Sequence, residues 1–248
     1  MRFVKYEREH RLAIVTLNRP DRLNALGNQV RQELAQAWHM FADDPEARVA
    51  ILTGTGRAFS AGMDIKDIAE GTRSEWDPAR PQPFHPRSQP KPVVAAVNGL
   101  ALGAGFDLLA MGADVCIAAE SAVFGMPEVI HGLFSLGTPF AVHHIPLNLI
   151  MEIVLTGDNI TARRAYEIGV VNRVVRDDQL MPEALKMARR IAEHPPLAVK
   201  MIRQNLLKAV EVSETARILE HYLRKEVYAS SEAAQGAKAF VERRKADI

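Results

Sequence analysis

The stretch NGLALGAGFD, residues 98–107, decides the fold because it joins three kinds of local structure. It follows VVAAV at 93–97, an uninterrupted apolar run typical of a strand buried on both faces of a sheet. The glycines favour a tight turn, and the apolar segment from Gly103 to Met111 predicts a buried helix. The N–H groups at the start of such a helix can stabilise an anion, or a carbonyl that gains negative charge. A turn that only packs the helix on the strand explains the same residues equally well.

Strands and helices alternate over the first 145 residues. Apolar runs at 12–17, 49–53 and 113–118 predict further strands, and apolar residues at helical spacing between Val30 and Phe41 predict a helix. Continuous apolar strands separated by helices indicate an α/β protein whose sheet is covered on both faces. The pattern beyond about residue 145 is helical, and the helices are expected at 180–194, 199–210, 213–229 and 232–245.

The composition restricts the partners and the compartment. The chain has 248 residues, with 31 basic and 30 acidic side chains. A net charge near zero supplies no general attraction to nucleic acids or anionic membranes, so neither is an expected partner. The N-terminal residues are too charged for a secretory signal, and Cys116 lies in an apolar run as an expected buried thiol. The cytoplasm is the expected location, and an organelle matrix reached with a cleaved transit peptide is the alternative.

Residues 78–92 hold six of the fourteen prolines, which predicts a surface loop.

Two further segments carry residues suited to chemistry. GRAFSAGMDIK, residues 56–66, follows a predicted buried strand, and its small residues permit a tight turn close to a ligand. FGMPEVIHGL, residues 124–133, places Glu128 behind a proline among apolar residues, where burial raises a carboxyl pKa toward the range useful for proton transfer. An ordinary turn and a helix-capping glutamate are the respective alternatives. His143 and His144 are adjacent and lack the i, i+4 geometry of a zinc pair, so no metal site is expected.

In order and spacing, these segments resemble the crotonase, or enoyl-CoA hydratase/isomerase, family. The likeness covers nearly the whole chain. Its motifs are NRP at 18–20, LNAL at 23–26, AGMDIK at 61–66, the segment 98–105, FGMPE at 124–128, LTG at 155–157, AYEIGVVN at 165–172 and AFVERRK at 239–245. The resemblance implies a ββα-spiral core over residues 1–190 and a helical trimerisation region over residues 191–248. It also implies a homotrimer or a dimer of trimers.

The chemistry that the resemblance implies agrees with the interpretation of the separate segments. Family members bind acyl-CoA thioesters and stabilise an enolate-like thioester oxygen between two backbone N–H groups, which match Met63 and Ala104 here. In hydratases of the family, two carboxylates activate water and pass a proton to the α-carbon, and Glu128 and Asp107 match them. The segment that follows Asp107 is one residue longer than the family pattern, so counting back from its far end places Leu108 at the second position.

Coenzyme A enters as part of the thioester substrate, and no prosthetic group is implied. By resemblance, the residues that line the CoA cleft are Arg22, Leu23, Ala25, Ala61, Asp64, Ile65 and Lys66. Phe240 and Arg243 match an aromatic residue and a cation that reach the CoA of a neighbouring subunit in this family. A solvated helix face is the alternative for the basic run that contains Arg243.

The sequence therefore predicts an enzyme that hydrates a 2-enoyl-CoA to a 3-hydroxyacyl-CoA. A Δ3,Δ2-enoyl-CoA isomerase, or another crotonase-type reaction, is the alternative if Glu128 acts alone. A non-catalytic acyl-CoA- or RNA-binding protein is the alternative of another class, and the near-neutral charge argues against RNA.

Overall fold

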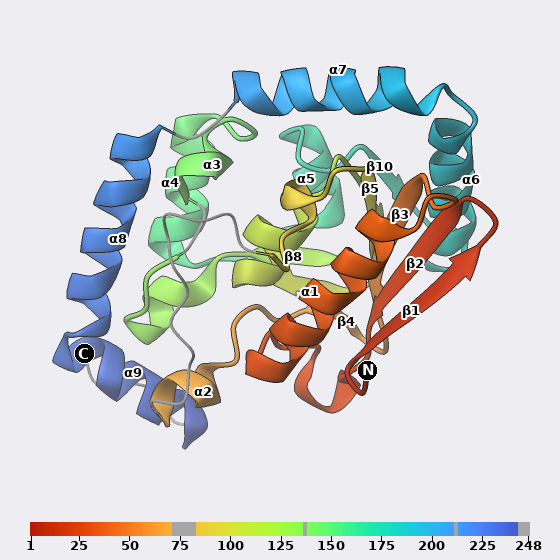
Figure 1. The fold of residues 1–248 in the computed structure, drawn as a ribbon. Coiled ribbons are helices and arrows are strands. Elements are labelled where there is room, and N and C mark those ends of the chain that lie inside the picture. The colour runs from red at the N-terminus through yellow and green to blue at the C-terminus, as the bar shows by residue number, and fades with distance from the viewer. Residues whose placement is uncertain (71–82, 136–137, 211–212, 243–248) are drawn as a thin grey trace.

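The computed structural model describes residues 1–70, 83–135, 138–210 and 213–242, and Figure 1 shows the arrangement of its elements. Within these residues, a six-stranded sheet has the order β1-β2-β3-β5-β7-β10, and a four-stranded sheet has the order β4-β6-β8-β9. The larger sheet contains β1 (Val4–Glu9), β2 (Leu12–Leu17), β3 (Val49–Gly54), β5 (Val93–Val97), β7 (Val115–Ala119) and β10 (Arg173–Val175). The smaller one contains β4 (Ala58–Ser60), β6 (Leu100–Leu102), β8 (Val123–Gly125) and β9 (Ile160–Thr161).

The two sheets are linked by repeated β-β-helix units, which confirms the predicted spiral. Each of β3, β5 and β7 passes directly into a strand of the smaller sheet, namely β4, β6 and β8. A helical segment then follows: α2 (Ile65–Ala69), the turns η3 (Gly103–Gly105) and η4 (Phe106–Ala110), and η5 (Pro127–His131). Since β4, β6 and β8 pair in parallel, the segments that leave their C-terminal ends lie side by side.

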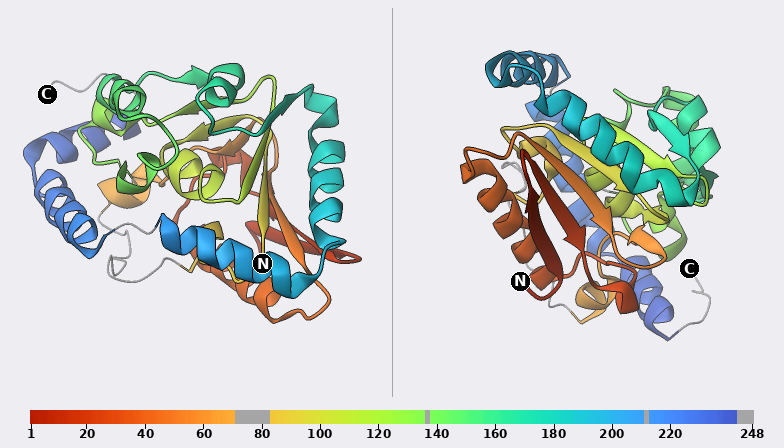
Figure 2. Two further views of the ribbon diagram at one scale, coloured as in Figure 1. Left: turned by 90° about the horizontal axis from the view of Figure 1, so that it is seen from above. Right: turned by 90° about the vertical axis from the view of Figure 1, so that its right-hand side faces the viewer.

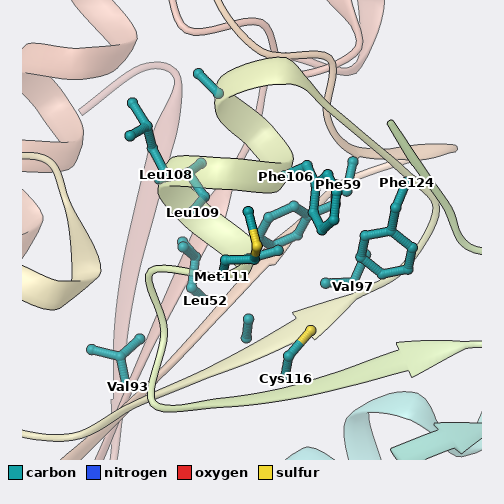
Figure 3. Packing of buried hydrophobic residues seen from close by; sticks show 14 of the residues in the cluster. Leu52, Phe59, Val93, Val97, Phe106, Leu108, Leu109, Met111, Cys116 and Phe124 are labelled. Carbon is teal, nitrogen blue, oxygen red and sulfur yellow. The ribbon is translucent and has the colours of Figure 1, made fainter. Parts of the chain in front are cut away.

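Helices bury both faces of the larger sheet, as the continuous apolar strands predicted. Helix α1 (Asn28–Asp43) covers one face, and α6 (Leu180–Ala192) covers the other (Figures 1 and 2). Within β5, alternate residues point to opposite sides: Val93 and Val97 join the cluster on the α1 side, and Val94 joins that on the α6 side. Cys116 lies in the first cluster (Figure 3), where burial raises the pKa of its thiol to about 12.

The remaining helices form a frame around this core. They include η1 (Pro20–Arg22), η2 (Pro86–Ser88), α3 (Thr138–Ala141), α4 (Leu147–Thr156), α5 (Ala162–Glu167), η6 (Asp177–Gln179), α7 (Pro196–Ala209), α8 (Glu214–Tyr228) and α9 (Ser231–Val241). Helices α7 and α8 run along two sides of the molecule, and α9 returns to pack on α2 and η5 (Figure 1). The predicted boundary after residue 190 falls inside the last turn of α6.

Several expectations from the sequence were only partly right. The region beyond residue 145 is not entirely helical, because the short strands β9 and β10 interrupt it. A strand of two or three residues is too short to show a period of two. The predicted helix from Gly103 to Met111 is a 3-10 turn followed by a π-helical turn. In the proline-rich segment, residues 78–82 lie outside the described residues, and Pro86–Ser88 forms one 3-10 turn with proline at its first position.

No helix in the described parts of the chain is long and apolar enough to cross a membrane.

Candidate active site

Three segments that the sequence singled out meet where β4, β6 and β8 end. Gly62 follows β4 with a φ of +85°, a conformation that favours glycine. A Cβ added to Gly62 would lie 2.6 Å from the carbonyl oxygen of Leu102 and 3.1 Å from the nitrogen of Ala104. The loop that carries Met63 is therefore packed against the turn that carries Ala104. The two predicted N–H donors come from neighbouring backbone segments.

The loop of residues 19–26 holds Met63 in place. The N–H of Leu26 donates to the carbonyl of Gly62 at 2.7 Å, and Leu26 forms a parallel β-bridge with Met63. The N–H of Ala61 donates to the carbonyl of Leu23 at 2.9 Å. Both hydrogen bonds are made by residues that precede Met63, and the bond to the Gly62 carbonyl fixes the direction of the peptide that contains the Met63 N–H.

Asn24 organises this loop, a role that the sequence analysis missed. Its side chain is fully buried, accepts from the N–H of Arg19 at 2.8 Å and donates to the carbonyl of Ala58 at 2.7 Å. The hydroxyl of Ser60 donates in turn to the carbonyl of Asn24 at 2.9 Å. Asn24 also has a positive φ of 55°, which asparagine tolerates better than most residues. The signal was the asparagine in LNAL, whose polar side chain needs partners when the neighbouring apolar residues are buried.

Ala104 is the second residue of the 3-10 turn η3. The first N–H groups of a helical turn have no carbonyl acceptor inside it, so they are available to a ligand. Gly103 starts the turn with a φ of +48°, and a side chain at Gly105 would collide with the carbonyl of Ser60. Gly105 therefore allows the turn to lie directly on β4.

Glu128 lies beside this turn, in the first turn of η5 after Pro127. A Cβ added to Gly103 would lie 2.5 Å from Oε1 of Glu128, so this carboxylate oxygen contacts the glycine that precedes Ala104. The hydroxyl of Ser135 donates to Oε2 at 3.0 Å. Burial raises the pKa of Glu128 above its usual range, and the Ser135 hydrogen bond opposes this effect. The predicted carboxyl group is therefore partly desolvated and adjacent to the predicted donor.

Asp107 lies in the π-helical turn η4, and none of its surface is exposed. The N–H of Met111 donates to the carbonyl of Phe106 at 2.9 Å, five residues back. A π-turn accommodates one extra residue in a helix and is frequent at functional sites, which accounts for the extra residue noted after Asp107. Leu108, the alternative for the second catalytic position, packs in the apolar cluster with Leu109 (Figure 3). Asp107 is therefore the candidate at this turn that carries a carboxyl group.

The predicted CoA-binding residues fall mainly on the loop 19–26 and the segment 61–66. Arg22 is exposed, Ala25 and Asp64 are buried, and the others are half-buried: Leu23, Ala61, Ile65 and Lys66. Asp64 accepts from Arg19 at 2.8 Å and from the N–H of Lys66 at 3.2 Å. Its carboxylate thus ties the loop to the start of α2, a contact that the sequence did not indicate.

Phe240 lies on α9, near η5 of the same chain. Its ring meets that of His131 edge-on, with the centroids 5.0 Å apart, and it remains 44% exposed. Gly236 allows this approach, because its backbone packs directly on the carbonyl of His131. Arg243 lies outside the described residues.

The fold and site define a class of protein: a spiral α/β protein in which the turn that carries Ala104 lies against Gly62 on one side and beside the carboxyl group of Glu128 on the other. Such a site can stabilise an oxyanion and move a proton next to it. The sequence matches the family Enoyl-CoA hydratase/isomerase over residues 7–248, and the chain belongs to this family.

Similar proteins carry related names. The 2,3-dehydroadipyl-CoA hydratase of Escherichia coli is 36% identical over 251 residues, which cover 97% of this chain and 96% of that protein. The crystal structure of carnitinyl-CoA hydratase from Mycobacterium avium is 32% identical, with a TM-score of 0.90 over 100% of this chain and 98% of that one. An enoyl-CoA hydratase structure from Mycobacterium tuberculosis is 36% identical, with a TM-score of 0.78 over 99% and 98% of the two chains.

Proposed function

We propose that this protein hydrates a 2-enoyl-CoA to a 3-hydroxyacyl-CoA. The observation that carries the proposal is the contact between Oε1 of Glu128 and Gly103, one residue before the donor Ala104. A group that can accept and donate a proton therefore lies beside a group that can stabilise a thioester oxygen. Relatives named as hydratases of dehydroadipyl-CoA and enoyl-CoA support the same reaction.

The reaction follows from these positions. The thioester oxygen accepts hydrogen bonds from the N–H groups of Met63 and Ala104. Water adds to C3 while the carboxylate of Glu128 removes one of its protons, and the electrons of the double bond move to the thioester oxygen as an enolate. Protonation of C2 by Glu128 then restores the carbonyl. Asp107, three residues after Ala104, is proposed as the second carboxyl group that orients the water. Losing one oxyanion donor of this kind costs about 2.7–4 kcal/mol of transition-state stabilisation.

Recognition of CoA is proposed to use the loop 19–26 and the segment 61–66. Arg22 and Lys66 supply positive charge toward the phosphates, while Leu23 and Ile65 offer apolar contacts. Asp64 contributes by holding the loop through Arg19. The contribution of Phe240 and Arg243 to CoA bound by a neighbouring subunit stays a prediction of the family resemblance.

Glu128→Gln tests the proposal. The variant is expected to lose hydration of a short 2-enoyl-CoA, followed by loss of absorbance of the conjugated thioester, by at least about 10²-fold. Binding of CoA, measured by calorimetry, is expected to stay within about twofold, since the substitution removes a proton-transfer group and leaves the cleft intact. Glu120→Gln is the matched control, because Glu120 is exposed at the end of β7. Full activity of the Glu128 variant would remove the residue from the mechanism.

The second candidate is double-bond isomerisation with Glu128 as the single acid/base group. Asp107 is completely buried, whereas the substrate enters from solvent. This burial favours a reaction that does not need Asp107. A panel of 2-enoyl- and 3-enoyl-CoA thioesters of graded length separates the two reactions. If the protein catalyses neither reaction, the remaining candidate is a protein that binds acyl-CoA without turnover.

We also propose assembly into a homotrimer or a dimer of trimers. Large apolar side chains are exposed on α7 and α8, where a neighbouring subunit would bury them: Leu197, Ile202, Leu206, Leu219 and Tyr222. Sedimentation equilibrium measures the oligomeric state, and a monomer at micromolar concentration would contradict the proposal.

The cytoplasmic location stays a prediction, since some relatives are named as mitochondrial proteins.

A further inference from the structure

We propose that Ser135 is a positioning residue that gives the two oxygens of Glu128 different roles. Oε2 is held by the serine hydroxyl, and Oε1 is the oxygen that exchanges the proton with water and substrate. The part of this proposal that concerns the reaction rests on the function proposed above.

The two oxygens occupy different surroundings. A Cβ added to Gly103 would lie 2.5 Å from Oε1 but 3.8 Å from Oε2, so Oε1 is the oxygen on the side of the Ala104 turn. Oε2 accepts the hydrogen bond from Ser135 at 3.0 Å. The carboxyl group is therefore held at both ends, by a backbone contact on one side and a hydroxyl on the other.

A turn in the backbone brings Ser135 to Glu128. Gly132 ends η5 with a φ of +63°. The N–H of Gly132 donates to the carbonyl of Val129 at 3.1 Å, and that of Leu133 donates to the carbonyl of Glu128 at 3.0 Å. The chain thus reverses after η5 and returns Ser135 to the carboxyl group seven residues earlier. Because Gly132 ends the helical turn between the two residues, helical periodicity does not account for the pair, and no sequence pattern predicts it.

The hydrogen bond has two physical consequences. The terminal torsion of a glutamate is broad and nearly two-fold, so an unrestrained carboxyl group exchanges its oxygens easily. Ser135 restrains this rotation and keeps Oε1 toward the turn that binds the thioester oxygen. A donated hydrogen bond also favours the ionised carboxylate, which opposes the rise in the pKa of Glu128 caused by burial. Ser135 therefore orients the carboxyl group and, together with the backbone hydrogen bond at Glu128, limits the rise in its pKa.

Ser135→Ala tests the proposal, with Ser135→Thr as the variant that retains a hydroxyl. The carboxyl carbon of Glu128 is titrated by 13C NMR and assigned with Glu128→Gln, and kcat/KM is measured against pH. The acid limb of kcat/KM reports the free enzyme's base, so it is expected to move to higher pH in Ser135→Ala. Activity should fall several-fold at the acidic end and approach the wild type at the alkaline end. KM should change less than twofold, and Ser135→Thr should restore the wild-type profile.

The titration needs no turnover, so it separates this proposal from the proposed function. A wild type that is inactive on every enoyl-CoA would overturn the function, while the NMR titration would still test the hydrogen bond. A folded Ser135→Ala variant whose carboxyl titration and acid limb coincide with those of the wild type would overturn the role of Ser135.

Discussion

The Cα of Gly103 lies against Oε1 of Glu128, and a methyl group on Gly103 would stand 2.5 Å from that oxygen. The same glycine has a φ of +48° and starts the turn that presents the N–H of Ala104. One residue thus supports both the predicted oxyanion donor and the predicted acid/base group. Its lack of a side chain is needed for each.

Gly103→Ala is therefore expected to lower kcat by about 10²-fold, because a misplacement of about 1 Å at the reacting groups costs that much. The methyl group must push the carboxylate of Glu128 away from the turn. Steady-state hydration of a short 2-enoyl-CoA measures the loss, and CoA binding measures whether the cleft survives.

Gly169→Ala is the matched control. Gly169 has a φ of +86°, and a Cβ added there would meet nothing within 4 Å. Both substitutions place alanine in the left-handed region, which costs about 1–2 kcal/mol of stability. Only Gly103→Ala adds a collision with the site. Equal losses of kcat in the two variants would show that backbone strain, and not the contact with Glu128, explains the effect.

Asp107→Asn separates hydration from isomerisation. Asparagine has nearly the same size as aspartate but lacks the negative charge with which the carboxylate would orient the water. If both carboxyl groups act, hydration should fall by about 10²-fold or more while isomerisation of a 3-enoyl-CoA continues. Thermal unfolding checks that the buried amide is tolerated. Unchanged hydration would leave Glu128 as the acting carboxylate and would contradict the two-carboxylate scheme.

The carboxyl group of Glu128 is also expected to lower the free energy of unfolding as the pH rises. Burial raises its pKa in the folded protein above the unfolded value, so its ionised form is disfavoured on folding. The stability associated with the protonated group is complete below the ordinary glutamate pKa, and it is lost as the pH rises through the folded pKa. Glu128→Gln does not titrate. Its Tm should therefore exceed that of the wild type more at pH 8 than at pH 4, and a difference independent of pH would refute the raised pKa.

The sequence predicted the parts of the fold that depend on continuous apolar runs. The strand at Val93–Val97 and a tight turn at Gly103–Gly105 are found where the pattern placed them. The placement of Glu128 beside that turn follows from the parallel pairing of β6 and β8, which no local pattern reveals. The family resemblance supplied that relationship.

The hydrogen-bond partners of side chains in loops could not be predicted from the sequence. Asn24 and Ser135 are ordinary polar residues whose partners lie elsewhere, and their roles depend on how the loops return to the site. The π-turn at Asp107 left only an indirect sign, an extra residue in a helical segment. Hydrogen bonds of this kind depend on tertiary structure, and neither periodicity nor residue propensity encodes them.

The attachment of α7 depends on one buried arginine. Arg203 is 8% exposed, its Nε donates to Asp114 at 2.8 Å, and its Nη1 donates to the carbonyl of Gln89 at 2.6 Å. Arg203→Ala is expected to lower the free energy of unfolding by about 1.5–3 kcal/mol, because it removes the charge-assisted hydrogen bonds of a buried guanidinium to Asp114 and to the carbonyl of Gln89. Urea denaturation measures the change. Arg189→Ala removes an exposed ion pair with Glu9 and should cost less than about 1 kcal/mol. A similar loss in both variants would show that α7 is held by its apolar contacts and not by Arg203.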